Sequence, residues 1–334
     1  MKEIDMNNLS LSVSNIKLKH LSLFSNHLNL TLMPVNEWKE RYIDPRTDFG
    51  FKYLFGTPMN KELLIGFLNA IFHGTHIIKD LTYLNGEQLG IRKEDRRAIF
   101  DVYCETESGE KFIVEMQNVF QQFFKDRSVY YSTFPIREQA KRGDWDYRLE
   151  SVYTVGILNF VFDEDKNSKD YFHHEVKLMD VNTKKVFYDK LTFIYLELPK
   201  FTKTEHELET LFEKWIFVLK NLSRLLERPA ALQERVFNRL FEAASIARFT
   251  PKQLREYEDS VKAYRDIVNA VNTARKEGHE EGHEKGLKEG LEEGLKKGRE
   301  EEKMEIVRKM KSDGLPDDVI AKYIGLPIEE IERI

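Results

Sequence analysis

Two acidic residues, Asp101 and Glu115, lie in neighbouring segments that both have the composition of β-strands. Residues 98–104 and 111–117 are rich in β-branched and aromatic side chains, which predicts a hairpin. Because side chains alternate between the two faces of a strand, Asp101 lies opposite Glu115 only if the connecting loop has an odd length. A three-residue loop over 107–109 meets this condition and places a glycine last, where such loops favour a left-handed backbone. We therefore expect the two carboxylates to face each other.

A pair of opposed carboxylates is a candidate metal site. Their Cβ atoms would lie roughly 5 Å apart, and the two negative charges repel unless a cation lies between them. Oxygen ligands at this spacing suit Mg²⁺ or Mn²⁺. Acidic residues are also common on the open face of a hairpin, so a solvated surface is the alternative. On the other face of the first strand, Phe100, Val102 and Cys104 are expected to point into the core, which makes Cys104 a packing residue.

The elements that would hold this hairpin indicate a mixed α/β domain over residues 37–203. Apolar residues at helical spacing predict a buried helix over 60–72, and a second helix is expected over about 124–142. Segments 152–162 and 191–198 are rich in β-branched and aromatic residues and predict buried strands. Strands separated by helices are typical of an α/β sheet.

The remainder of the chain is predicted to be helical, apart from a weakly ordered N-terminal tail over residues 1–36. Residues 204–274 are expected to form a helical subdomain, with capping-box patterns that begin at Thr204 and Thr250. A charged linker helix is expected over 275–303, followed by a small helical pair over 304–334.

Glycine occupies every fourth position of the linker helix, from residue 278 to residue 298. Each glycine costs about 1 kcal/mol relative to alanine in a helix, so an isolated helix of this composition is expected to be marginal. One interpretation is that the glycine stripe lets two helices approach closely. This interpretation predicts a homo-oligomer formed through this helix. A solvated, fraying linker helix is the other.

Length and composition exclude several classes of protein. The chain has 334 residues and a net charge of −5, and its 23 phenylalanines and 14 tyrosines exclude a fully disordered protein. The longest apolar-rich stretch, 152–162, is much shorter than the about 20 residues of a membrane span. A single cysteine and a start without the apolar segment of a signal peptide predict a cytoplasmic protein. The mildly acidic total still permits nucleic-acid binding through a local basic patch.

Several motifs, in order along the chain, resemble the Rpn group of recombination-promoting nucleases and transposases, which belongs to the PD-(D/E)XK nuclease superfamily. Asp101 followed by Glu115-Met116-Gln117 resembles the D…(E/D)-x-K signature of that superfamily. Residues 47–56, TDFGFKYLFG, resemble the opening motif of the Rpn group, and the glycine repeat resembles its tail. The resemblance covers about residues 40–334. It implies an α/β fold with a PD-(D/E)XK restriction-endonuclease-like mixed sheet flanked by helices and a long helical C-terminal extension.

The resemblance also implies hydrolysis of DNA phosphodiester bonds with Mg²⁺, or with Mn²⁺ in its place. Asp101 and Glu115 would hold the metal, helped by the backbone carbonyl of Met116. The ion would polarise the phosphate and activate a bound water. Asp48 would add a further metal contact, with a role on the helix surface or at its cap as the alternative.

One position departs from the superfamily signature, because Gln117 stands where lysine is usual. Glutamine supplies a hydrogen-bond donor and an acceptor but no charge. The Rpn group carries this glutamine, so Gln117 stays in the predicted catalytic set. The positive charge is then expected to come from elsewhere, with Lys52, Lys111 and Arg97 as candidates.

DNA contacts are expected from basic residues around the hairpin, because contacts to phosphates supply most non-specific affinity. The candidates lie before the first strand and on the following helix: Lys52, Arg97, Arg127, Arg137 and Lys141. Ordinary solvated charge is the alternative for each of them. The H-E-x-x-H pattern at 279–283 is rejected as a zinc site, because it lies within the glycine repeat and has no third ligand.

The expected function is a metal-dependent DNA endonuclease linked to recombination or mobile elements. Two alternatives belong to other classes of protein. One is a DNA-binding or mobile-element accessory protein with weak or no catalysis. The other is an assembly protein that acts through its C-terminal helices.

Overall fold

The computed structural model describes residues 40–74, 76–88, 98–140, 145–168 and 171–334. The tail predicted over residues 1–36 lies outside these residues. The compact unit described below begins at Arg41 and contains a six-stranded mixed sheet flanked by helices, as the sequence predicts. No helix in the described part of the chain combines the length and apolarity needed to cross a bilayer.

The sheet is mixed because its central strands are parallel and its outer strands are antiparallel. Strands β5, β6 and β8 run parallel to one another, whereas β1, β4 and β7 pair antiparallel with their neighbours. The order across the sheet is β1 (Leu81–Tyr83), β4 (Val102–Thr106), β5 (Lys111–Gln117), β6 (Val152–Leu158), β8 (Val186–Glu197) and β7 (His173–Met179). A separate two-stranded sheet joins β2 (Glu87–Gln88) to β3 (Ala98–Ile99).

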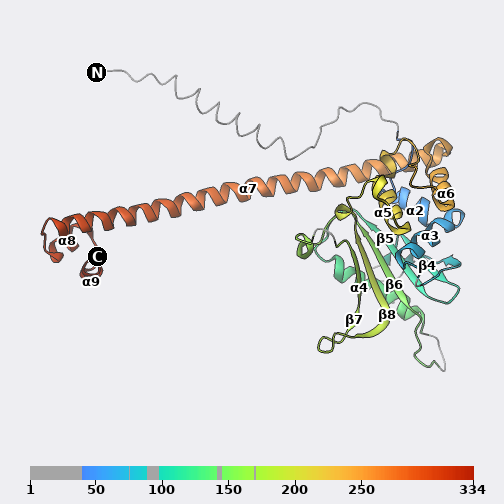
Figure 1. Ribbon diagram of the computed structural model, residues 1–334, viewed down its shortest axis with the longest axis horizontal. Coiled ribbons are helices and arrows are strands. Elements are labelled where there is room, and N and C mark those ends of the chain that lie inside the picture. Colours follow the sequence, from blue (N-terminus) through green and yellow to red (C-terminus); the bar gives the residue numbers. More distant parts are fainter. Residues whose placement is uncertain (1–39, 75, 89–97, 141–144, 169–170) are drawn as a thin grey trace, which may run out of the picture. The chain divides into compact units, whose positions relative to one another are not determined.

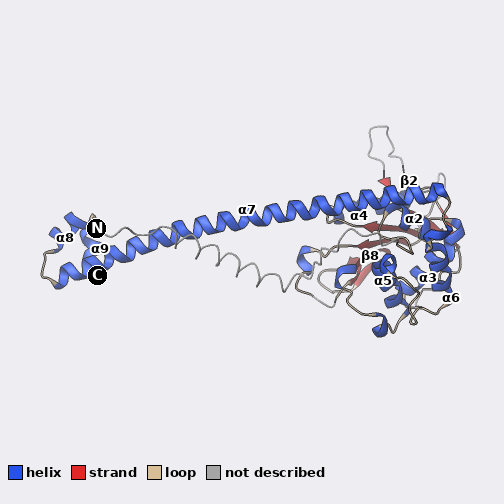
Figure 2. Cartoon of the chain, turned by 90° about the horizontal axis from the view of Figure 1, so that it is seen from above, coloured by secondary structure: helices blue, strands red, loops and turns tan. Residues whose placement is uncertain are grey.

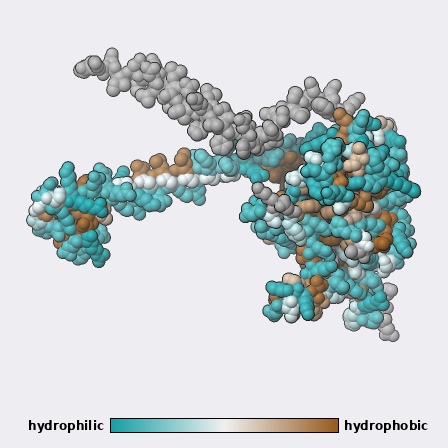
Figure 3. All heavy atoms as spheres, viewed as in Figure 1, coloured by the Kyte–Doolittle hydropathy of each residue, from teal (hydrophilic) through white to brown (hydrophobic). Residues whose placement is uncertain are grey.

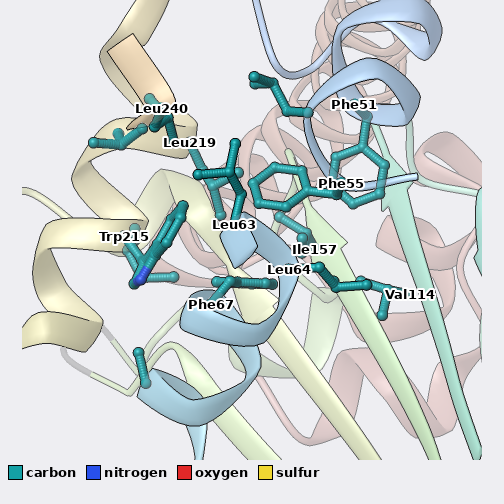
Figure 4. Close-up of a cluster of buried hydrophobic side chains, with 14 of the residues drawn as sticks. Phe51, Phe55, Leu63, Leu64, Phe67, Val114, Ile157, Trp215, Leu219 and Leu240 are labelled. Atoms are coloured by element: carbon teal, nitrogen blue, oxygen red, sulfur yellow. The ribbon is translucent and has the colours of Figure 1, made fainter. Parts of the chain in front are cut away.

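The main hydrophobic core lies on one face of the sheet. It is covered by four helices, namely α2 (Asp48–Phe55), α3 (Lys61–Ile71), α5 (Leu211–Asn221) and α6 (Arg235–Ala244). Figure 4 shows Trp215 and Leu240 from the last two helices beside Phe55 and Phe67, with Val114 and Ile157 of the sheet nearby. Cys104 is fully buried in this cluster, which confirms its predicted packing role.

The opposite face of the sheet is covered by α4 (Phe124–Glu138) (Figures 1 and 2). This helix packs through two separate apolar clusters. Phe134 packs in a cluster with Tyr103 and Ile113, whereas Phe124 packs in a cluster with Leu158 and Tyr195. The α4 face therefore has apolar packing at both ends of the helix.

The C-terminal region begins with predicted caps and continues into one long helix. The capping box at Thr250 and Gln253 is present and starts α7 (Pro251–Ser312), a helix of 62 residues. The box at Thr204 is also present, but it starts only the single 3₁₀ turn η4 (Glu205–Glu207). Helix α5 instead begins after a second capping box, at Thr210 and Glu213.

Helix α7 runs through both of the boundaries predicted at residues 274 and 303. Those divisions therefore follow composition rather than breaks in secondary structure, and we keep them as a proposal. Two short helices, α8 (Asp317–Ile324) and α9 (Ile328–Glu332), follow α7 and pack against its end through a small apolar cluster. Along the middle of α7 hydrophobic side chains gather on the exposed surface (Figure 3), and the exposed leucines there are Leu287, Leu291 and Leu295.

The strand predicted over 98–104 is interrupted. Residues Phe100 and Asp101 separate β3 from β4, and Phe100 packs in the cluster of Tyr103 rather than in the main core with Val102. The prediction for Phe100 is wrong because it assumed unbroken alternation through the segment. Strand β7 was not predicted, since its residues are mostly polar and lie at the edge of the sheet.

Candidate functional site

The hairpin of β4 and β5 has the predicted register. Val102 pairs with Val114, which is the last pair of the β4–β5 ladder, and Asp101 immediately precedes β4. The three-residue loop closes through a hydrogen bond of 2.9 Å from the Thr106 N–H to the Glu110 carbonyl. Gly109 has a φ of 85°, the left-handed conformation that the loop requires. The predicted hairpin register and loop are confirmed. Asp101 itself lies in a bend before β4, where its carboxylate interacts electrostatically with that of Glu115.

The face that carries Glu115 is the one that α4 covers, and it is not an open surface. Alternation along β5 puts Glu115 on the same side as Ile113, which packs against α4. Only 7% of Glu115 is exposed, so a solvated hairpin surface is excluded for this residue. Asp101 is partly buried. The register was predictable from the hairpin alone, whereas this burial depends on a helix from another part of the chain.

Burial shifts the titration of both acids in the same direction. Desolvation, followed by the nearby charge of Asp101, raises the pKa of Glu115 to about 8, and the Arg127 guanidinium opposes the shift. Desolvation also raises the pKa of Asp101, and the hydrogen bond from the Met116 N–H opposes that change. Two adjacent acids that both resist ionisation form a site that favours the approach of a cation.

Asp101 is held from two directions. Its Oδ2 accepts a hydrogen bond of 2.9 Å from the Met116 N–H, and its Oδ1 lies 3.9 Å from Lys52 Nζ. Lys52 also bonds Asp48 Oδ1 at 2.6 Å, one helical turn earlier on α2. Helix α2 starts at Asp48 because the Thr47 side chain accepts from the Gly50 N–H. The structure therefore brings both predicted α2 residues to the border of the site, with Asp48 well exposed.

Gln117 and Arg127 interact directly. Gln117 Oε1 accepts a hydrogen bond of 2.7 Å from Arg127 Nη2, and Gln117 Nε2 donates to the Val119 carbonyl at 2.9 Å. The same Arg127 nitrogen lies 3.7 Å from Glu115 Oε2. The guanidinium lies over the ring of Phe124 at 5.2 Å. Arg127 was predicted only as a DNA contact, and its position beside Gln117 was not foreseen, because strand and helix spacing does not show which helix residue faces the strand.

Two further basic residues named in the sequence, Arg137 and Lys111, lie away from the acidic pair. Arg137 is exposed ten residues further along α4, roughly 15 Å from Arg127 along the helix axis. Lys111 begins β5, at the end opposite Gln117, and pairs with Glu105 at 3.3 Å. Arg97 and Lys141 lie outside the described residues. Of the predicted DNA contacts, the structure thus brings Lys52 and Arg127 to the acidic pair.

The donor set at the hairpin suits a hard divalent cation. Asp101 and Glu115 offer neighbouring carboxylate oxygens, which are the ligands that Mg²⁺ and Mn²⁺ prefer. Their raised pKa values reflect a buried pair that lacks close compensation. The residues present therefore fit such an ion.

A second group of possible ligands lies further across the sheet. Asp165, His174 and Glu197 each place one ligand atom within 4.8 Å of the others. Glu197 is fully buried, but its Oε2 already lies 2.6 Å from the ammonium of Lys200. Because that ammonium already balances the buried carboxylate, we interpret the group as a buried ion-pair network. The partners of His174 lie 9 and 23 residues away along the chain, so local spacing does not show this group.

A groove opens beside the candidate site at the carboxyl ends of β5 and β6. It has a volume of about 670 Å³ and is bordered on its far side by α7. Its lining combines amides, aromatic rings and basic groups, including Asn118, Phe120, Asn159, Phe160, Tyr264 and Arg275. The carboxyl edge of parallel strands is a common location for ligand binding.

The comparisons with known proteins agree with this geometry. Residues 45–274 match the model of a family described as PD-(D/E)XK nuclease family transposase, which confirms the resemblance seen in the motifs. No curated protein and no solved structure matches the chain. Because the family match covers more than half of the chain and includes the hairpin, α2 and α4, the chain belongs to the PD-(D/E)XK nuclease transposase family.

Proposed function

We propose that the protein is a metal-dependent DNA endonuclease that hydrolyses phosphodiester bonds during recombination or the movement of mobile elements. The observation that carries this proposal is the neighbouring pair of acids Asp101 and Glu115, of which Glu115 is buried and Asp101 partly buried. Burying two acids together costs free energy unless a cation compensates them. Membership of a nuclease family makes a divalent ion the expected cation.

Asp101 and Glu115 would hold Mg²⁺, or Mn²⁺ in its place, with the Met116 carbonyl and Asp48 as further candidate ligands. When bound, such an ion supplies Lewis-acid activation of the phosphate and of an attacking water. The Met116 N–H keeps the Asp101 carboxylate oriented, because it fixes one of its two oxygens. Gln117 would position the water or the phosphate through its amide, which Val119 and Arg127 hold in place.

DNA would approach across the α2 and α4 ends, where Lys52 and Arg127 lie, and extend toward the groove beside β5. Exposed aromatic and basic side chains suit a nucleic-acid strand, because rings stack on bases and cations contact phosphates. Arg137 stays in the proposal as an outlying phosphate contact. Arg97 and Lys141, which lie outside the described residues, stay in it as further phosphate contacts. We place the activity in the cytoplasm, in keeping with a single buried and unpaired cysteine.

A second candidate function is assembly through the C-terminal helices. The observation that favours it is the exposed line of leucines beside the glycines of α7, described above. Assembly of this kind is compatible with nuclease activity, since it uses a different part of the chain. A DNA-binding accessory protein without catalysis is the outcome to which a negative nuclease test would lead.

The test is nicking of supercoiled plasmid by the purified full chain, with Mg²⁺ or with EDTA. Asp101→Asn and Glu115→Gln keep the shape of each side chain but remove the charge that binds metal. We expect either change to lower nicking by at least about 100-fold, a loss typical of removing one essential group. Glu107→Gln, the same type of change on the exposed hairpin turn, is the control and should leave nicking unaltered.

Two outcomes contradict the proposal. Equal nicking by wild type and by both site variants would place the activity elsewhere. A complete absence of nicking with DNA binding retained over a range of salt concentrations would favour the accessory protein.

A further inference from the structure

The candidate site lacks a cation at the strand position where the superfamily signature has lysine. Gln117 occupies that position and is neutral. Hydrolysis of a phosphodiester builds negative charge on the phosphate, and fixed positive groups lower the barrier by stabilising that charge. If the proposed function holds, a cation must come from another element.

Arg127 is the cation that the structure brings closest to Gln117. Its Nη2 donates to Gln117 Oε1 at 2.7 Å and lies 3.7 Å from Glu115 Oε2. Two rings on the same helix support the guanidinium, Phe124 at 5.2 Å and Tyr131 at 5.7 Å. Arg127 comes from α4, so it reaches the strand end from the opposite side of the site to α2.

The contacts of Arg127 leave much of its charge available. Its two hydrogen-bond partners, Gln117 and Gln121, are both neutral, and its distance to Glu115 exceeds that of a direct hydrogen bond. Lys52, by contrast, is bonded to Asp48 at 2.6 Å. Within the part of the chain that the structure describes, the buried Nε–H of Arg127 also has no acceptor. A phosphate oxygen would satisfy that donor, since guanidinium groups bind phosphates through paired N–H groups.

Gln117 and Arg127 also depend on each other. A lysine at position 117 would place an ammonium within hydrogen-bond distance of the guanidinium, and like charges at that separation repel strongly in a partly buried site. A glutamine carbonyl instead accepts the hydrogen bond from Arg127. The neutral residue on the strand and the charged residue on the helix therefore form one unit.

We propose that Arg127 supplies the fixed positive charge of this site in place of a strand lysine, by binding the substrate phosphate and positioning Gln117. The proposal rests on the proposed function and names a role that the strand motif does not contain. An uncharged residue at position 127 together with a lysine at position 117 should therefore do the work of the wild-type pair.

The experiment compares four proteins: wild type, Arg127→Gln, Gln117→Lys and the double variant. We expect Arg127→Gln to lower plasmid nicking about 100-fold, as removal of a charge-stabilising donor does. Gln117→Lys alone should lower nicking about tenfold and reduce the melting temperature, because two cations then meet. The double variant should melt above Gln117→Lys and nick at least about tenfold faster than Arg127→Gln, so the two changes are not additive.

DNA affinity without metal gives a readout that does not depend on catalysis. In EDTA, the slope of log affinity against log salt reports the number of phosphate contacts, and losing one contact changes it by about 0.9. We expect Arg127→Gln to reduce the slope by this amount. Arg148→Gln is the matched control, because Arg148 is exposed and precedes β6 at the end of the sheet away from Gln117. It should change neither slope nor nicking.

Three results would overturn the proposal. The first is an unchanged salt slope together with unchanged nicking in a folded Arg127→Gln protein. The second is a double variant that is as inactive as Arg127→Gln while melting like wild type. The third applies if wild type itself does not nick DNA. The proposed function then fails, but the salt slope still measures whether Arg127 contacts phosphate, and the melting temperatures still measure whether it repels a lysine at position 117. An unchanged slope and no melting penalty in Gln117→Lys would then reject it.

Discussion

Glu115 is an acid at a buried position of β5, where an apolar side chain is the usual occupant. Desolvation and the neighbouring Asp101 raise its pKa to about 8 in the folded state, against an ordinary value of 4.5 for glutamate. Between these two values the folded protein holds a proton that the unfolded chain has released. The free energy of unfolding therefore falls as pH rises from about 4.5 to about 8. The cost of this carboxylate is greatest under the alkaline conditions in which it would bind metal most readily.

Replacing Glu115 with glutamine should remove this pH dependence. In EDTA we expect Glu115→Gln to be more stable than wild type at pH 8.5, by on the order of 3 kcal/mol, and close to wild type at pH 5. Urea unfolding at the two pH values measures the difference. Glu107→Gln, on the exposed turn, should show no such gain. A Glu115→Gln protein no more stable at pH 8.5 than at pH 5, relative to wild type, would show that the carboxylate is better solvated than its burial indicates.

The candidate site was partly predictable at this scale. The register of the hairpin followed from an odd loop length and a terminal glycine, both of which are local. The burial of Glu115 and the contact between Gln117 and Arg127 were not predictable in this way. They depend on how α4 lies across the sheet, which hydrophobic periodicity within one segment does not specify. The network around His174 was missed for the same reason.

At the scale of elements, the position of α4 depends on a close approach to β6. A Cβ atom at Gly156 would lie 3.0 Å from Tyr195 Cδ1 and 3.3 Å from Phe124 Cζ. Phe124 is the first residue of α4, and Arg127 lies less than one turn beyond it. The absence of a side chain at Gly156 therefore lets the start of α4 approach the sheet closely enough to bring Arg127 to the site.

Gly156→Ala should both destabilise the fold and weaken the site. We expect a loss of about 1–3 kcal/mol in the free energy of unfolding, typical of overpacking in a core. Nicking should fall even where the variant stays folded, because a displaced Phe124 moves Arg127 away from Gln117. Urea unfolding and plasmid nicking below the transition measure the two effects. Gly278→Ala is the control, since nothing lies within 4 Å of an added Cβ there. If Gly156→Ala is destabilised but nicks DNA as fast as wild type, the activity does not depend on how closely α4 approaches the sheet.

The sequence predicted the type of most elements better than their extent. The buried helix expected over 60–72 corresponds to α3, and the cap at Thr250 starts α7 as expected. The strand expected over 98–104 is broken at Phe100 and Asp101, which belong to neither β3 nor β4. Strand β8 starts at Val186 rather than near 191, since its first half pairs only with the polar edge strand β7. Pairing at the edge of a sheet depends on backbone hydrogen bonds to the neighbouring strand. The pattern of side chains in the sequence therefore gives little indication of it.

At the scale of the whole molecule, the glycines of α7 destabilise the helix without any compensating contact within the part of the chain that the structure describes. Its glycines each cost about 1 kcal/mol relative to alanine, and nothing lies within 4 Å of a Cβ added at any of those from 278 to 298. The glycines from 290 to 298 line a shallow groove that also contains Leu291 and Leu295. Exposed leucines beside a groove of glycines are costly in a monomer and useful in a pair of closely packed helices. Close packing would explain why alanine is not used.

This explanation makes opposite predictions for helix stability and for self-association. Gly290→Ala with Gly294→Ala should raise the helicity of α7, because each alanine favours the helix by about 1 kcal/mol. If two copies pack through this groove, the added methyl groups hold the helices apart, and the dissociation constant should rise by at least about tenfold, or 1.4 kcal/mol. Circular dichroism and sedimentation equilibrium of the full chain measure the two quantities.

The matched control is Gly278→Ala with Gly282→Ala, where the neighbouring residues are His279 and His283 instead of leucines. This pair should raise helicity and leave association unchanged. If both pairs raise helicity and neither alters the mass of the particle, the glycines serve no interface. Helix α7 would then be a solvated linker whose marginal stability is tolerated, because the sheet, the hairpin and α4 hold the candidate site without it.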